Sequence, residues 1–387
     1  MPSEALIEVA RRLRQARRSR GIEPEELERR LILGPGWISA FESGDHVPSL
    51  DMLLALIAEL DLSPSRFFRG LSLSETRAQA ERKLLVEPDG EDVLLRFPYG
   101  EHDATYRLAG ASRDEVESII GGLRDDLARL ADPPPNESQA IKADAVATAF
   151  LRSVRQWPHA NPSDLWWFLV YRAYCDPFNH PAMFARLDLS QSWKRTAGWA
   201  LEEVLVRFYA DFLRQNEINL FVPQGNRKVD LLRQVKIAGR LEPDKVDVLL
   251  TGSRDGQEVC FGVVHVKSSF AERRTDDVPL SQALIEAGYT SPLWTMDCKS
   301  TPAESPFNKG ELGVTLEPER DRRSAKRRDV EDEGYFSACF SYNQNTIPTP
   351  TGQEATARVM VCDFRDPNDA FSEFVVRSWG DFRQREA

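Results

Sequence analysis

One stretch of the sequence, KVDVLLTGSRDGQEVCFGVVHVKSSFAERR at residues 245–274, constrains the fold more than any other. Two apolar runs flank a polar turn, which is the pattern of a β-hairpin. The first run nevertheless contains Asp247, and the second contains Lys267. A charge in the middle of a sheet is unfavourable unless a partner, a metal ion or a solvent-filled cleft compensates it. The hairpin therefore predicts a functional site on a sheet.

Side chains alternate between the two faces of a strand, so His265 and Lys267 should point one way while Val264 and Val266 point into the core. If the two runs pair, Asp247 lies opposite Lys267. An aspartate is a hard oxygen ligand for Mg²⁺, and an ammonium group can position or activate a water molecule. Phosphodiester hydrolysis needs both groups. The alternative interpretation is a purely structural ion pair between the two side chains.

Composition limits the class of protein. The chain has 387 residues, of which 41% are hydrophobic, and it contains no apolar run long enough to span a bilayer. We therefore expect a soluble protein of several domains. The first twenty residues lack the apolar block and cleavage site of a signal peptide, which predicts a cytoplasmic location. The five scattered cysteines form no CxxC pair and indicate reduced packing residues.

The net charge of −11 disfavours a protein that coats a polyanion, but local basic clusters can still contact DNA.

Turn signals divide residues 1–72 into about five short amphipathic helices. Residues 76–130 have the pattern of a β-meander followed by a capped helix, which we interpret as a small connector. The segment ADPPPNES at 131–138 predicts a stiff exposed linker. Residues 139–387 mix helical and strand patterns and predict an α/β or α+β domain.

Residues 27–44, LERRLILGPGWISAFESG, have the pattern of two helices joined by a tight turn, and they resemble the Cro/repressor-like helix-turn-helix family. The resemblance implies that this module binds DNA, whereas a protein-binding or dimerising role is the alternative. The segment Pro35–Trp37 stands where the family usually presents polar base-reading side chains. The preceding helix instead offers Arg11, Arg14 and Arg18, which are suited to the DNA backbone, unless they form a solvated face balanced by nearby glutamates.

An aspartate on one strand of a hairpin and a lysine near the end of the next resemble the PD-(D/E)xK nuclease superfamily. The resemblance implies a catalytic pair of Asp247 and Lys267, with Asp244 as the alternative aspartate, and a Mg²⁺ cofactor. His265 stands where this superfamily usually has an acidic metal ligand. Histidine is a poor ligand for magnesium, so a carboxylate is expected from another position.

The preceding helical segment supplies the favoured replacement. Its GxxxE pattern, from Gly198 to Glu202, resembles the acidic position on the first core helix of the superfamily. The predicted metal ligands are therefore Asp247 and Glu202. Glu272 and Glu286 are the alternatives, because some restriction enzymes of this superfamily take the acid from a helix that follows the lysine.

The segment that follows the lysine, up to residue 300, is similar to the BsaWI-type restriction endonucleases, relatives of the enzymes that cut palindromes with a CCGG core. The resemblance implies that Glu272, Arg273 and Arg274 read bases, since arginine can bond guanine and glutamate can accept from cytosine; an exposed charged turn is the alternative. We therefore expect a multi-domain chain with an all-α helix-turn-helix bundle, a small α+β connector and an α/β restriction-endonuclease-like nuclease domain. Its expected activity is that of a type II restriction endonuclease that cuts double-stranded DNA as a homodimer or higher homo-oligomer. A transcription regulator with a non-catalytic nuclease-like domain is the alternative.

Overall fold

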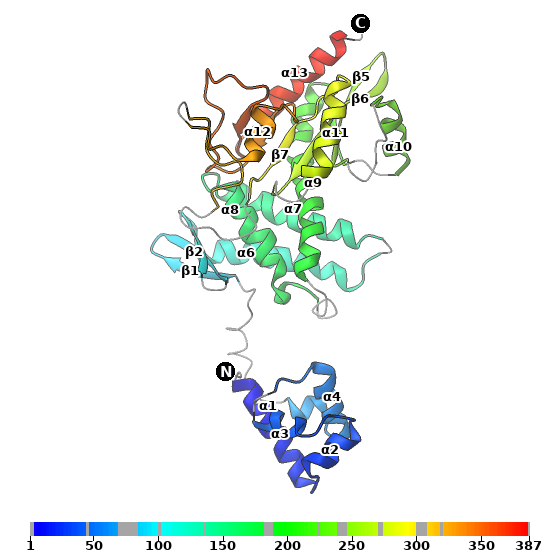
Figure 1. Cartoon of the computed structure of the whole chain (residues 1–387), viewed down its shortest axis with the longest axis vertical. Coiled ribbons are helices and arrows are strands. Elements are labelled where there is room, and N and C mark those ends of the chain that lie inside the picture. The colour runs from blue at the N-terminus through cyan, green and yellow to red at the C-terminus, as the bar shows by residue number, and fades with distance from the viewer. Residues whose placement is uncertain are drawn as a thin grey trace. The chain divides into compact units, whose positions relative to one another are not determined.

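The computed structural model describes residues 4–43, 46–68, 84–99, 102–134, 136–181, 189–222, 225–237, 246–269, 274–298, 308–317 and 320–385. The chain forms two compact units, Met1–Glu81 and Arg82–Ala387 (Figure 1). Each unit is described by itself. Within the described ranges no helix is long and apolar enough to cross a membrane.

The first unit is the predicted bundle of short helices. They are α1 (Glu4–Ser19), α2 (Pro24–Arg30), α3 (Trp37–Ser43), α4 (Leu50–Glu59) and α5 (Pro64–Phe67). Leu27, Ile38 and Phe41, which the sequence places at core spacing, have no exposed surface and pack in one cluster with residues of α1 and α4. This unit therefore has a hydrophobic core of its own.

The second unit opens with the predicted meander. Strands β1 (Leu85–Asp89), β2 (Asp92–Tyr99) and β3 (His102–Leu108) pair antiparallel in that order. Helix α6 (Arg113–Ala128) begins with a capping box in which Ser112 and Glu115 exchange hydrogen bonds. Residues 132, 134, 136 and 137 of the expected linker are exposed, but hydrophobic residues before and after them belong to one cluster. The division into a connector and a nuclease domain at this segment stays a prediction.

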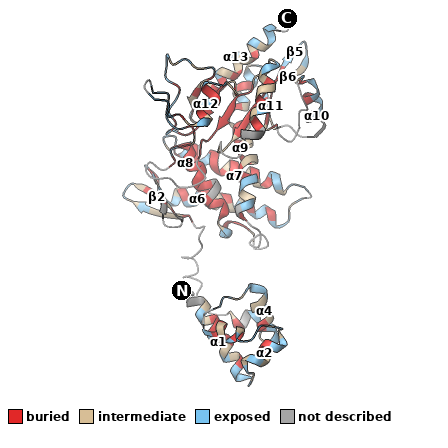
Figure 2. Ribbon diagram, viewed as in Figure 1, coloured by how far each residue is buried: buried red, intermediate tan, exposed pale blue. Residues whose placement is uncertain are grey.

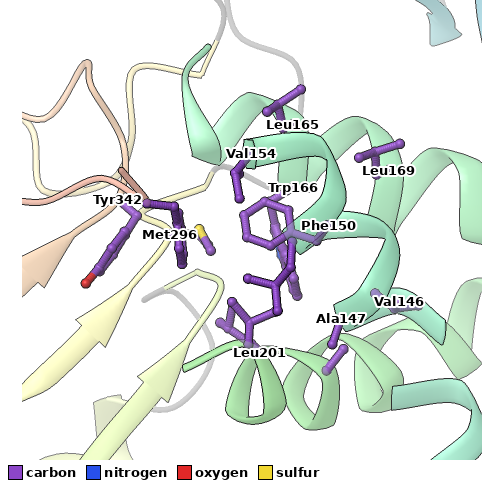
Figure 3. Packing of buried hydrophobic residues seen from close by; sticks show 14 of the residues in the cluster. Val146, Ala147, Phe150, Val154, Leu165, Trp166, Leu169, Leu201, Met296 and Tyr342 are labelled. Carbon is purple, nitrogen blue, oxygen red and sulfur yellow. The ribbon is translucent and has the colours of Figure 1, made fainter. Parts of the chain in front are cut away.

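A helical layer follows the linker. It contains α7 (Ser138–Gln156), α8 (Pro162–Trp166), the π-helical segment η2 (Trp167–Ala173), the 3₁₀ turn η3 (Pro177–Asn179) and α9 (Leu189–Gln215), while the 3₁₀ turn η1 (Arg129–Ala131) ends α6 before the linker. Figure 3 shows Phe150 of α7, Trp166 of α8 and Leu201 of α9 in one packed cluster, with Met296 and Tyr342 approaching from the sheet side. This packing holds α9 between the helical layer and the sheet.

A mixed sheet forms the centre of the unit. Its strands are β4 (Ile218–Phe221), β5 (Val248–Arg254), β6 (Gln257–Lys267), β7 (Leu293–Thr295), β8 (Cys339–Ser341) and β9 (Val359–Val361), in that order. Strands β4 to β6 are antiparallel, whereas β6 to β9 are parallel. The predicted turn between β5 and β6 contains Asp255 and Gly256, both with positive φ, as tight hairpins require.

Helices cover both faces of this sheet. Residues of α9 and α13 (Ala370–Arg385) pack against Val248, Val264 and Trp294 on one face. On the other face, α10 (Gly225–Gln234) and α11 (Arg274–Glu286) pack over β5 and β6, and α12 (Ala325–Glu331) lies with residues of β7 to β9. Figure 2 shows buried residues concentrated in the sheet and in α7 to α9. The five cysteines are free and buried, as predicted.

Candidate active site

The hairpin of β5 and β6 brings Asp247 and Lys267 together. The strands pair antiparallel with Val248 opposite Val264, so the residue before β5 meets the end of β6. The Asp247 Oδ2 atom accepts hydrogen bonds from Lys267 Nζ at 2.6 Å and from the backbone N of Val266 at 2.9 Å. Both charged side chains are 11% exposed. The juxtaposition that the alternating pattern predicts is therefore present, at a site that solvent can still reach.

The alternation of β6 separates packing from polar chemistry. Val264 and Val266 are buried in the cluster on the α9 side of the sheet. His265 and Lys267 lie on the opposite face, where both approach Asp277 of α11. His265 differs from an open active-site histidine, because it has no exposed surface.

Asp277 is a third charged residue of the site, and the sequence patterns do not single it out. It lies in the first turn of α11, with Oδ1 at 3.4 Å from Lys267 Nζ and 3.8 Å from His265 Nδ1. Burial tends to raise its pKa, but the His265 ring and the Lys267 ammonium outweigh burial, so the pKa is lowered. An acid in the first turn of a helix is also stabilised by the helix dipole. Asp277 therefore remains an anion beside Lys267.

Two of the acidic residues that the sequence offers as metal ligands lie on helices, and their roles stay predictions. Glu202 is half-buried on α9, as its place on the predicted core helix requires. Glu286 is exposed at the last position of α11, two turns beyond Asp277.

The remaining predicted site residues are not described. Asp244, Glu272 and Arg273 lie outside the described residues. Arg274 begins α11, but its side chain is outside the described set. Their roles stay predictions. The sequence signal for Asp277, which contacts Lys267, is the Asp276–Asp277 pair about ten residues after the lysine.

The donor set is suited to a hard divalent cation. Within the described ranges no group of three or more His, Cys, Asp or Glu side chains is placed to hold a metal ion by itself. Magnesium, however, commonly takes one or two carboxylates from the protein and completes its shell with water and substrate phosphates. Asp247 and Asp277, which share Lys267 as a neighbour, fit that requirement.

The predicted backbone-contacting arginines of the first unit differ in their freedom. Arg11 Nε lies 2.6 Å from Glu8, and Arg14 Nε lies 3.2 Å from Glu42. Arg18 is exposed, and among the described residues it forms no ion pair. Arg18 can therefore contact a DNA phosphate directly, whereas Arg11 and Arg14 must first weaken or break an ion pair with a glutamate.

A buried glutamate stabilises the turn between α2 and α3. The buried Glu28 carboxylate accepts hydrogen bonds from the backbone N atoms of Gly36 (3.2 Å) and Ile38 (2.9 Å), and so caps α3. Ile32 adopts a positive φ of 55° and is 94% exposed. The described exposed residues of α3 are Ser39 and Ser43, neither of which is basic.

The basic run RDRRSAKRR at 320–328 resembles a DNA-contacting loop in sequence but is partly buried. Its second half belongs to α12, whose N-cap is Ser324. The Nη1 atoms of Arg323 and Arg327 lie 3.0 and 2.6 Å from the carboxylate oxygens of Glu331. The side chains of Arg327 and Glu331 have no exposed surface. Two arginines of the run therefore stabilise the fold, and only the others are available to solvent.

Comparisons with known proteins agree with this fold. A family model described as a helix-turn-helix domain matches residues 8–66. Over 252 residues the chain is 36% identical to the type II restriction enzyme AgeI of Thalassovita gelatinovora, which covers 63% of this chain and 87% of the relative. The crystal structure of an AgeI–DNA complex matches with a TM-score of 0.61 and 33% identity, over 74% of this chain and 99% of that chain. A pre-specific BsaWI–DNA complex is 15% identical, with a TM-score of 0.34 over 70% of this chain and 94% of that chain, which is too remote to carry an argument.

The mixed sheet, the Asp247–Lys267 hairpin and these comparisons together define a restriction endonuclease. The chain belongs to the family of the type II restriction enzyme AgeI, and it carries an N-terminal helix-turn-helix domain. It is a site-specific deoxyribonuclease. The expected fold class and enzyme class are confirmed.

Proposed function

We propose that this enzyme cuts both strands of double-stranded DNA at a palindrome in a Mg²⁺-dependent reaction, with its active site at the β5–β6 hairpin. The observation that carries the proposal is the position of Lys267 between two carboxylates, those of Asp247 and Asp277. The AgeI structure is that of a DNA complex, which supports DNA as the substrate here.

In this proposal Asp247 and Asp277 hold the cation. When bound, Mg²⁺ would supply Lewis-acid stabilisation of the phosphate and a more acidic water molecule. Lys267 Nζ is held by both carboxylates, so it is fixed where it can orient the attacking water and stabilise charge that develops on the phosphate. Asp277 takes the role that the superfamily assigns to the residue at His265, because it lies on the same face of the sheet and its Oδ1 atom is 3.4 Å from Lys267 Nζ.

DNA recognition is divided between two parts of the chain. Glu272, Arg273 and Arg274 follow the catalytic lysine directly, and we assign them to base reading in the major groove. The first unit contributes contacts of Arg11, Arg14 and Arg18 to the DNA backbone. A palindrome presents two identical half-sites, which a homodimer matches by its own two-fold symmetry.

The test is cleavage of a long DNA that contains many candidate sites. Mg²⁺ should produce discrete fragments, EDTA should prevent them, and sequencing of the fragment ends should give one palindrome, with a CCGG-like core as the specific expectation. Light scattering of the protein should give at least twice the chain mass. Discrete fragments in EDTA would contradict the metal requirement, and ends that share an asymmetric sequence would contradict the symmetric arrangement.

A further inference from the structure

His265 occupies the position from which the superfamily usually takes a metal ligand, yet it is completely buried. Its ring is fixed on one side by an edge contact with Phe336, with ring centroids 5.4 Å apart. Its Nε2 atom lies 3.0 Å from Ser291 Oγ. Its Nδ1 atom faces Asp277 and has no hydrogen-bond partner among the described residues. A buried polar atom of this kind calls for an explanation.

The hydroxyl groups behind His265 decide where its proton resides. Ser281 Oγ donates to Ser291 Oγ at 2.7 Å, which leaves the single proton of Ser291 for His265 Nε2. A neutral ring that accepts at Nε2 must carry its proton on Nδ1, the atom that faces Asp277. Ser291 is itself fixed, because its backbone N donates to Ser337 Oγ at 2.8 Å.

The same elements hold the acid in place. Asp277 and Ser281 are four residues apart on α11, so both lie on the helix face turned toward β6. Ser281 and Ser291 have no exposed surface. Through His265 of β6, the hydroxyl pair therefore links the helix that carries the acid to the strand that carries the lysine.

We propose that Ser281, Ser291 and His265 form a buried relay that presents an N–H group to Asp277 and orients this carboxylate toward the metal site. The proposal rests on the proposed function, in which Asp277 holds the cation. His265 is then a positioning residue: it has replaced an acid in the sequence, and it supports the acid that α11 supplies instead. Outer partners of this kind fix metal-binding carboxylates, and their loss typically weakens metal affinity or activity by about 10–100-fold.

The test uses a matched pair of substitutions in the full-length enzyme. In His265→Asn the amide reaches the position of Nδ1 and keeps a donor toward Asp277. In His265→Gln the amide reaches the position of Nε2, so it keeps the contact with Ser291 but loses that donor. Ser291→Ala removes one oxygen atom and frees the ring to place its proton on Nε2. Ser153→Ala, at another fully buried serine, whose hydroxyl donates to Phe150 O within α7, is the control.

Two quantities are measured for each folded variant: the dissociation constant for Mn²⁺, from electron paramagnetic resonance of the free ion, and the Mg²⁺ concentration that gives half-maximal single-turnover cleavage. We expect both to rise about tenfold or more in His265→Gln and Ser291→Ala, with the maximal rate largely recovered at high Mg²⁺. His265→Asn and Ser153→Ala should stay within about threefold of the parent enzyme.

The outcomes separate this inference from the proposed function. Equal metal dependence in His265→Asn and His265→Gln, with Ser291→Ala unchanged, would overturn the relay even if Asp277→Asn abolishes cleavage. Full activity of Asp277→Asn would overturn the part of the proposed function that gives Asp277 the cation. If both His265 variants fail to fold, Ser291→Ala alone decides, because it removes only one atom from the relay.

Discussion

A variant that begins at Arg82 tests how the two units divide the work of DNA binding. The first unit has its own hydrophobic core, and the second contains the whole β5–β6 site, so the deletion removes one folded body without entering the other. The exposed residues of α3 include no base-reading pair, whereas Glu272 and Arg273 stand beside the catalytic lysine in the sequence. We expect the shortened enzyme to keep its cleavage sequence and to bind DNA more weakly.

The magnitude follows from the arginines of α1. Each phosphate contact contributes about 0.9 to the slope of log affinity against log salt concentration. Arg18 is exposed and can make one phosphate contact. Arg11 and Arg14 can each make one only if they divide their hydrogen bonds between the DNA and their partners, Glu8 and Glu42. The slope should therefore become shallower by about 1 if Arg18 acts alone and by about 3 if all three contribute.

The assay compares full-length and shortened enzyme by fluorescence anisotropy on a cognate duplex at several salt concentrations, together with sequenced cut-site maps. The point variant Arg18→Ala provides the matched control and should reduce the slope by about 1 without changing the map. A shortened enzyme that cuts a shorter or different sequence would refute the reasoning, because the helix-turn-helix would then read bases. An unchanged salt slope would refute it as well, since the first unit would make no phosphate contacts.

Three further predictions concern the second unit. Glu202→Gln and Glu272→Gln distinguish the candidate metal ligands. Glu202→Gln should retain single-turnover cleavage, and Glu272→Gln should cut with relaxed sequence specificity. Loss of cleavage in Glu202→Gln would return the metal ligand to α9. Burial raises the pKa of Asp164 to about 7, so the folded state holds this proton more tightly than the unfolded state. The free energy of unfolding should therefore fall as the pH rises from about 4 to 7. Asp164→Asn should remove that part of the pH dependence, as measured by thermal melting. Arg327→Met removes one of the two buried arginines that pair with Glu331, while Arg323 remains, and should destabilise the fold by about 1.5–3 kcal/mol in chemical denaturation, with no change in DNA affinity.

The hairpin site was accessible from the sequence because every step depends on local periodicity. Alternation in β6 places His265 and Lys267 on one face, and the polar turn fixes the pairing that brings Asp247 to them. The same reasoning identifies the helix-turn-helix, whose core positions follow a helical repeat. These features need no knowledge of how distant elements pack.

Asp277 was not accessible in this way, because its role depends on where α11 crosses the sheet. Packing of Leu284 against Val263 and Leu249 sets that crossing, and no spacing in the sequence reports it. The basic run at 320–328 illustrates the same limit. Its pattern favours a charged surface, but the acid at Glu331 lies one turn beyond Arg327 and draws that arginine into the interior.

The central claim, that Asp247 and Asp277 flank Lys267 to form the catalytic site, is tested most directly by single-turnover cleavage of Asp277→Asn beside its neighbour control Asp276→Asn. Asp277→Asn should lower the cleavage rate at saturating Mg²⁺ by at least about 100-fold, as should Asp247→Ala and Lys267→Ala, while all three variants retain folding and cognate DNA binding. Asp276→Asn should cleave within a few-fold of the parent enzyme. A parent-like rate in Asp277→Asn, or an equal loss in Asp276→Asn, would contradict the account.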